Sequence, residues 1–164
     1  MKQFILILLV FAISSCTQQT DENKILQERV NPLDKKVADS YTPGFGEFMS
    51  GIQIHHNKLW FAGQNENWKL ADFEIHEIME AIDNIKKYQQ ERKESEMIDM
   101  INPALDSVNF AIKKKNPALF KRSFISLTHT CNQCHRTTNF EFIVVKIPDQ
   151  PPFSNQDFMN QVGK

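Results

Sequence analysis

Two cysteines and a histidine near the C-terminal end stand at a spacing that can hold a cofactor. They form the segment Cys131-Asn132-Gln133-Cys134-His135. Two thiols separated by two residues, with a histidine directly after the second, are the attachment motif for c-type haem. The thiols add to the two vinyl groups of the haem, and the histidine binds the iron. The motif therefore predicts covalent haem c on Cys131 and Cys134, with His135 as an iron ligand.

Other chemistries use two cysteines at this spacing. A zinc site needs a second pair of Cys or His ligands at short spacing, and the sequence offers no such pair. A thioredoxin-like redox pair is expected in a βαβ setting, whereas the residues around the motif have helical periodicity. A structural disulfide between Cys131 and Cys134 stays open, although it gives His135 no role. Haem attachment accounts for all three residues.

The N-terminus has the pattern of an export signal. Lys2 supplies a positive charge, and residues 4–13 are an unbroken apolar run. This run is too short to span a bilayer as a helix, which needs about 20 residues, but it suits the apolar region of a secretory signal. The following Ile13-Ser14-Ser15-Cys16 resembles a bacterial lipobox, in which the signal is cut before the cysteine. We expect a signal peptide over 1–15, a lipid on Cys16, and a polar tether over 16–41 in which a short helix is left open.

The composition of the chain excludes several classes of protein. The 164 residues carry a formal net charge of -1, and no run of five like charges occurs. This pattern argues against nucleic acid as a partner. Only 5 glycines are present, which disfavours a barrel or sandwich with many tight turns. An all-helical domain is therefore expected.

Four segments after the tether carry apolar residues at helical spacing. They run from Thr42-Pro43 to Gly63, from an Asn67 cap to about Arg92, from Asn102-Pro103 to the lysines near 114, and from Asn116-Pro117 through the motif. The residues expected to face the core are Phe45, Met49, Ile52, His56, Leu59, Ala71, Ile75, Ile78, Ile82, Ile85, Leu105, Val108, Ile112, Phe120, Phe124, Leu127, Cys131 and Cys134. Residues 93–101 are the longest connection, and short connections make consecutive helices antiparallel. We predict an all-α antiparallel four-helix bundle over 42–136, with residues 137–164 as a short extended C-terminal segment.

A haem motif near the end of the last of four amphipathic helices resembles the class II cytochromes c, which comprise cytochrome c′ and its six-coordinate relatives. The resemblance rests on Cys131, Cys134, His135 and the four-helix plan, over roughly residues 42–136. It implies a haem held between helices in an exported bacterial protein. The chain departs from this family in its long segment after His135, because those proteins end soon after the motif.

The residue on the other side of the iron decides whether a haem carries electrons or binds gas. Met49 stands about 9 Å along the first predicted helix from Pro43, a suitable depth for His135 on the antiparallel fourth helix, whereas His56 stands about 20 Å along. We therefore expect Met49 to bind the iron. His55, His56, Met97 and Met100 stay as alternative ligands, an open position is a further alternative, and His76 and His129 are expected to face solvent.

These residues together predict a membrane-tethered, periplasmic, monohaem c-type cytochrome that carries single electrons. Its expected partners are periplasmic or membrane redox proteins, and the lipid would hold it at the outer or inner membrane. No acid, base and nucleophile set stands out, so an enzyme is not expected. Two alternatives stay open: a five-coordinate haem protein that binds nitric oxide or carbon monoxide, and a haem subunit docked to a larger redox complex through residues 140–147. A homodimer is also left open.

Overall fold

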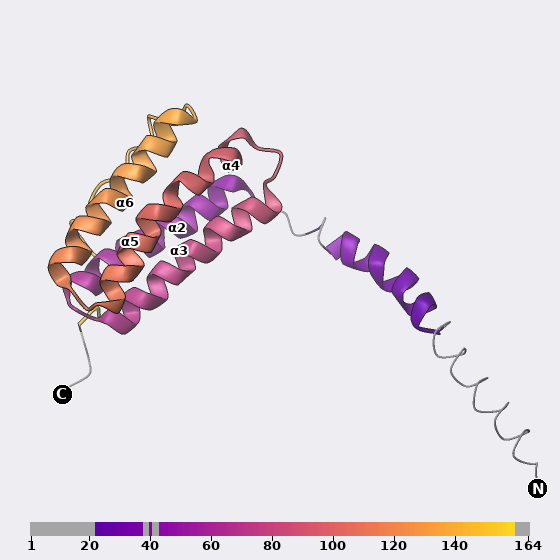
Figure 1. Cartoon of the computed structure of the whole chain (residues 1–164), viewed down its shortest axis with the longest axis horizontal. Helices are drawn as coiled ribbons and strands as arrows, with labels where there is room; N and C mark the ends of the chain where they lie inside the picture. The colour runs from indigo at the N-terminus through magenta and orange to yellow at the C-terminus, as the bar shows by residue number, and fades with distance from the viewer. Residues whose placement is uncertain (1–21, 38–39, 41–42, 160–164) are drawn as a thin grey trace, which may run out of the picture. The chain divides into compact units, whose positions relative to one another are not determined.

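The computed structural model describes residues 22–37, residue 40 and residues 43–159. Within these residues every regular element is a helix (Figure 1), which confirms the predicted all-α class. The predicted signal peptide, residues 1–15, and the predicted lipidation site, Cys16, lie outside the described residues. The chain separates into two compact units, Met1–Thr42 and Pro43–Lys164.

In the first unit, residues 22–37 are helical. The side chains of Leu26, Val30, Leu33 and Val37 recur at helical spacing on one face, and all four are exposed. The short helix that the sequence left open in the tether is therefore present.

The second unit contains four long helices and a short helical connection. They are α2 (Phe45–Gln64), α3 (Trp68–Tyr88), α4 (Lys93–Met97), the 3₁₀ helix η1 (Ile98–Ile101), α5 (Asn102–Lys113) and α6 (Pro117–Thr137). Helix α2 contacts α3 and α6, and α5 contacts α3 and α6. Consecutive long helices run in opposite directions in Figure 1, so the C-terminal end of α6 and the N-terminal end of α2 lie at the same end of the unit.

Two asparagines make the tight turns between these helices. The backbone N–H of Asn67 donates to the Ala62 carbonyl at 2.9 Å and closes α2, while the Asn67 side chain accepts from the Leu70 N–H at 3.3 Å and caps α3. Asn116 repeats both roles between α5 and α6, with its side chain accepting from the Leu119 N–H at 2.9 Å. The predicted caps at Asn67 and Asn116 are thus confirmed.

The other two predicted helix starts are wrong. Helix α2 begins at Phe45, and its first turn is closed by the backbone carbonyl of Gly44; Thr42 lies outside the described residues. Asn102 is already inside a helix, because η1 runs directly into α5. The Asn102 side chain donates to Asp99 at 3.0 Å instead of capping α5.

The region between α3 and α5 also differs from its prediction. Helix α3 ends at Tyr88 rather than near Arg92, whose backbone is extended at φ -89° and ψ 134°. The following residues are helical as α4 and η1, where the sequence predicts a loose connection. Burial explains the difference, because Ile98 and Ile101 both enter the core.

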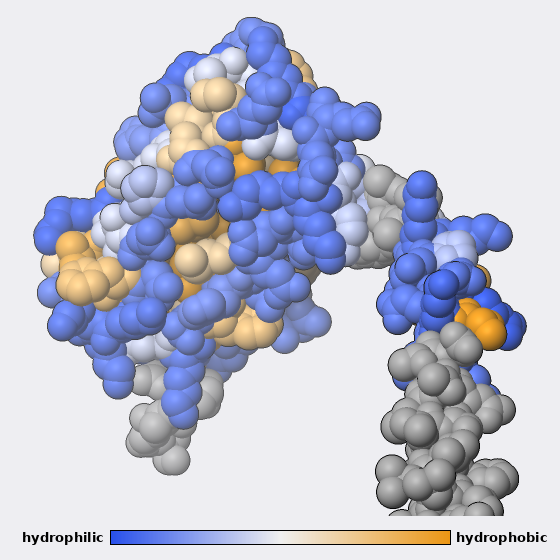
Figure 2. All heavy atoms as spheres, turned by 45° about the vertical axis from the view of Figure 1, so that its right-hand side comes forward, coloured by the Kyte–Doolittle hydropathy of each residue, from blue (hydrophilic) through white to orange (hydrophobic). Residues whose placement is uncertain are grey.

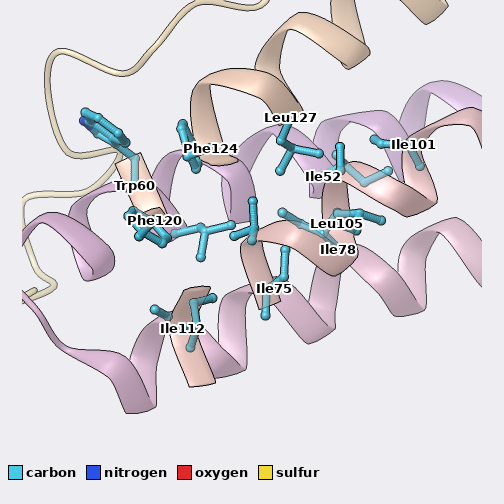
Figure 3. Close-up of a cluster of buried hydrophobic side chains, with 14 of the residues drawn as sticks. Ile52, Trp60, Ile75, Ile78, Ile101, Leu105, Ile112, Phe120, Phe124 and Leu127 are labelled. Atoms are coloured by element: carbon cyan, nitrogen blue, oxygen red, sulfur yellow. The ribbon is translucent and has the colours of Figure 1, made fainter. Parts of the chain in front are cut away.

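The core of the second unit is built from the stripes that the periodicity predicts. Most residues predicted to face the core are buried, whereas Phe45, Met49, Cys131 and Cys134 are half-buried. The buried ones are Ile52, His56, Leu59, Ala71, Ile75, Ile78, Ile82, Ile85, Leu105, Val108, Ile112, Phe120, Phe124 and Leu127. Figure 3 shows the side chains of several of these residues meeting between the helices. Burying an aliphatic side chain of this size stabilises the fold by about 1.5–3 kcal/mol. Polar side chains cover most of the outer face seen in Figure 2, interrupted by apolar patches.

One end of the core is a cluster of aromatic rings. The ring centroid of Trp60 lies 4.9 Å from that of Phe124 and 6.4 Å from that of Phe120, and Trp68 meets Phe120 edge-on at 6.1 Å. These contacts join the end of α2 and the start of α3 to the start of α6. Cys131, Cys134 and His135 lie toward the opposite end of α6.

The segment after α6 has no helix or strand in its described residues and returns toward this aromatic end. The Phe158 ring packs against Phe61 with centroids 5.8 Å apart, and the Lys58 ammonium lies 5.5 Å from the Phe153 ring centroid. Asn67 donates to the Met159 carbonyl at 3.2 Å. The C-terminal segment therefore runs back along α2 to the turn between α2 and α3.

Close packing of Gly63 against Phe120 gives the first prediction. A Cβ atom at position 63 would overlap the Phe120 ring, which is fully buried in the core. Gly63→Ala should lower the free energy of unfolding by about 1–3 kcal/mol, as overpacking of a core does. Urea unfolding followed by circular dichroism measures this change.

Gly51→Ala is the matched control on the same helix. A Cβ atom there meets nothing within 4 Å, so the better helix propensity of alanine should raise stability by about 0.5–1 kcal/mol. Equal effects of the two substitutions would contradict the close contact between α2 and α6.

Candidate cofactor site

Helix α6 carries the motif at a level set by its buried stripe. Phe120, Phe124 and Leu127 are buried, and Cys131 follows Leu127 by four residues, so that it packs against the edge of the core. Cys134 lies nearly one turn beyond Cys131. Both cysteines are half-buried, and neither forms a disulfide. Two thiols therefore stand on one side of α6 where the core meets the surface.

The surroundings of both thiols favour the protonated form. Burial, with a smaller contribution from the neighbouring Cys134, raises the pKa of the Cys131 thiol to about 12. Burial also raises the pKa of Cys134. Without a ligand, Cys131 is thus a neutral S–H group near pH 7.

The ring of His135 is oriented by the segment that follows α6. Its Nδ1–H donates to the backbone carbonyl of Ile143 at 2.8 Å. A carbonyl oxygen can only accept, so the proton is on Nδ1 and the lone pair of a neutral imidazole is on Nε2. This is the tautomer that a metal-binding histidine adopts when a backbone carbonyl holds its other nitrogen.

Asn132, inside the motif, holds the same segment. Its side-chain amide donates to the Val145 carbonyl and accepts from the Val145 N–H, both at 2.8 Å. Periodicity could not reveal this contact, because it joins residues 13 apart across a turn with no repeating pattern. Neither Asn132 nor the Ile143 carbonyl was predicted from the sequence as part of the site.

His56 is occupied by a buried hydrogen bond. It lies 4% exposed, and its Nε2–H donates to Thr128 Oγ1 at 2.9 Å, while the Thr128 hydroxyl donates to the Phe124 carbonyl at 3.0 Å. Burial lowers the pKa of His56 to about 4, so this side chain is neutral at pH 7. His56 thus joins α2 to α6 at Thr128, which lies less than one helical turn before Cys131 and nearly two turns before His135.

His55 points to α3 instead. Its Nδ1 lies 2.6 Å from an oxygen of Glu74, which is 1% exposed, and its Nε2 lies 3.9 Å from Glu77. The second oxygen of Glu74 has no hydrogen-bond partner among the described residues. Glu74 was missed in the sequence analysis, although it lies three residues after buried Ala71 and one before buried Ile75, a spacing that does signal burial.

The pairing of α2 with α6, extended by two helical turns, predicts that Met49 lies at the level of His135. His56 bonds to Thr128, and Trp60 packs on Phe124, so the two helices keep one antiparallel register over this length. Moving seven residues back from His56 along α2 and seven forward from Thr128 along α6 reaches Met49 and His135. Seven residues are nearly two turns, so each lies on the same helix face as the residue from which the count began.

The remaining candidate ligands are two histidines and two methionines, which differ in exposure. His76 and His129 are exposed, as predicted, and His76 bonds to the Asp72 carbonyl of its own helix at 2.6 Å. Met97 and Met100 are half-buried, and Met100 belongs to η1, which contacts α6. Met100 is therefore the main rival to Met49.

Comparison with known proteins gives no match to a family model, to a curated protein or to a solved structure. Among the described helices, none has both the length and the apolar character needed to cross a membrane.

The buried His56 gives a pH-dependent prediction. Its pKa is about 4 in the folded chain against 6.5 in the unfolded one, so between these values the unfolded state binds the extra proton. Stability contributed by neutral His56 is complete above pH 6.5 and falls by about 3 kcal/mol as the pH drops to 4. His56→Gln keeps a donor for Thr128 and does not titrate, so it should lose less stability over this range. Urea unfolding at pH 7.5 and pH 4 measures the difference.

His76→Gln serves as the control, because it removes an exposed histidine from a neighbouring helix. It should lose as much stability on acidification as the wild type does. Identical pH profiles for the wild type and His56→Gln would show that His56 is not held neutral by burial.

Proposed function

We propose that this protein is a monohaem c-type cytochrome that carries single electrons. The observation that carries the proposal is the environment of His135, whose Nδ1–H is held by the Ile143 carbonyl while Nε2 keeps its lone pair, next to two free thiols on the same helix. A histidine that binds a metal through Nε2 needs this tautomer. Neither a disulfide nor a zinc site would explain the two thiols and the oriented His135 together.

The motif residues fit covalent haem attachment. Cys131 and Cys134 are half-buried, so their sulfur atoms border both the core and the surface. Each S–H would add across one vinyl C=C bond, so no atom is released and no oxidant is needed. A bound haem would supply an iron that alternates between ferric and ferrous states by one electron. His135 would bind that iron through Nε2.

The surroundings of the motif supply apolar surface. Phe142 is 75% exposed and Val144 is 74% exposed, and they flank Ile143, whose carbonyl holds the His135 ring. Exposed apolar side chains next in sequence to a residue that contacts the site favour a ligand that is itself largely apolar. A porphyrin has this character, so these side chains support a haem at the motif.

Met49 is the proposed second iron ligand. Its support is the register count from the His56–Thr128 bond, which pairs Met49 with His135, and the packing of Met49 against the core, whereas Nε2 of His56 is used by Thr128. A thioether ligand raises the reduction potential relative to a second histidine. A six-coordinate iron changes little between oxidation states, which suits electron transfer. The alternative of an open position that binds nitric oxide or carbon monoxide becomes one outcome of the test below.

The proposed architecture is an antiparallel four-helix bundle of the class II cytochrome c type. Its support is the ring of contacts from α2 to α3, α5 and α6 and back to α2, with the motif near the end of the last helix. The proposed location is periplasmic, with a lipid on Cys16 holding the chain to the outer or inner membrane and redox proteins as partners. The third candidate, a haem subunit docked to a larger redox complex through residues 140–147, stays open, and Phe142, Ile143 and Val144 in that segment are exposed.

Optical and EPR spectra of the oxidised and reduced protein, with and without carbon monoxide, test this proposal. The wild type should have low-spin iron that does not bind carbon monoxide readily. Met49→Ala should convert it to high-spin iron that binds carbon monoxide at once, because the sixth position is then open.

Met79→Ala removes a half-buried methionine from α3 and should leave the spectra unchanged. Met100→Ala tests the rival ligand in the same way. High-spin iron in the wild type would contradict the electron-transfer proposal and favour gas binding. Loss of low-spin iron in Met100→Ala alone would identify Met100 of η1 as the second ligand.

A further inference from the structure

Two consecutive turns after α6 direct the chain back toward the Cys131–His135 motif. Asn139 adopts φ 64°, a left-handed conformation that asparagine tolerates better than most residues. The Phe140 N–H then donates to the His135 carbonyl at 2.7 Å, which closes α6 in a Schellman turn. The Ile143 N–H donates to the Phe140 carbonyl at 2.9 Å and completes a second turn. These two turns bring the Ile143 carbonyl to His135 Nδ1.

Apolar packing holds this part of the segment only weakly. Phe142, Ile143 and Val144 are 75%, 48% and 74% exposed. A stretch with so little buried apolar surface opens easily unless polar contacts fix it. Asn132 provides such contacts, because both its donor and its acceptor pair with the backbone of Val145. Only one residue separates Val145 from Ile143, so fixing the first restrains the carbonyl of the second.

We propose that Asn132 is a positioning residue that tunes the iron ligand His135 by holding the Ile143 carbonyl against its Nδ1–H; this inference rests on the proposed function. A firmly held acceptor draws the Nδ1 proton and makes Nε2 a stronger donor. A stronger donor favours the ferric state. The two Asn132–Val145 hydrogen bonds that hold the Ile143 carbonyl, here called the clamp, therefore lower the reduction potential. The long C-terminal segment thereby acts on the chemistry of the motif.

Asn132→Ala tests the clamp in the haem-loaded protein. We expect its reduction potential to rise above that of the wild type. The His135 Nδ1–H should exchange with solvent about tenfold faster in the reduced protein, as the loss of a net hydrogen bond predicts. Gln133→Ala is the matched control, because Gln133 is the exposed neighbour within the same motif, and it should change neither quantity. Asn132→Gln keeps the amide on a longer arm and should give a potential between those of Asn132→Ala and the wild type.

A haem-loaded Asn132→Ala protein that matches Gln133→Ala in both potential and exchange would overturn the inference. If Asn132→Ala fails to fold or to take up haem, hydrogen exchange of the Asn132 side chain in the wild type tests the clamp instead. Slow exchange of the Asn132 side-chain amide protons supports the clamp, and solvent-like exchange overturns it. Absence of covalent haem from the wild type would refute the proposed function, whereas Asn132 amide exchange in that haem-free protein would still test the clamp on its own.

Discussion

The antiparallel packing of α6 on α2 sets the level of each functional side chain along the helices. Its register is defined by the buried His56–Thr128 hydrogen bond and by the contact of Trp60 with Phe124. At one end of this pairing, aromatic rings close the core. At the other end the same stripe of α6 continues into Cys131, which is only half-buried. One helix pair therefore supplies both a closed core and two half-buried thiols near the edge of that core.

The C-terminal segment joins these two ends. It contacts the motif through Asn132 and Val145, and it reaches the aromatic end where Phe158 packs on Phe61. The sequence departs from the class II cytochromes it resembles in this segment. In the proposed function this segment has a role, because its Ile143 carbonyl orients the proposed iron ligand His135 from outside the helices. The segment is thus part of the site rather than an appendage.

Local rules predicted most of the helical core and less of the site. The stripe from Ala71 to Ile85 and the caps at Asn67 and Asn116 depend on neighbours within one or two turns, which spacing and residue type reveal. Asn102 has the same cap-and-proline pattern but fails as a cap, because buried Ile98 and Ile101 draw the preceding residues into a helix. The clamp at Asn132 and the buried Glu74–His55 contact join separate parts of the chain. Such pairings follow from the assembled fold, so a single sequence does not reveal them.

Covalent attachment of haem to Cys131 and Cys134 is the central claim, and intact mass under denaturing conditions tests it most directly. The chain is produced in a bacterial host that assembles c-type haem, as wild type and as the Cys131→Ser/Cys134→Ser double variant. Cys16→Ser, which removes only the predicted lipid thiol, is the control. The account predicts one haem added to the wild type and to Cys16→Ser, and none to the double variant. A wild-type mass equal to the polypeptide alone, or lower by the two hydrogens of a Cys131–Cys134 disulfide, would contradict it.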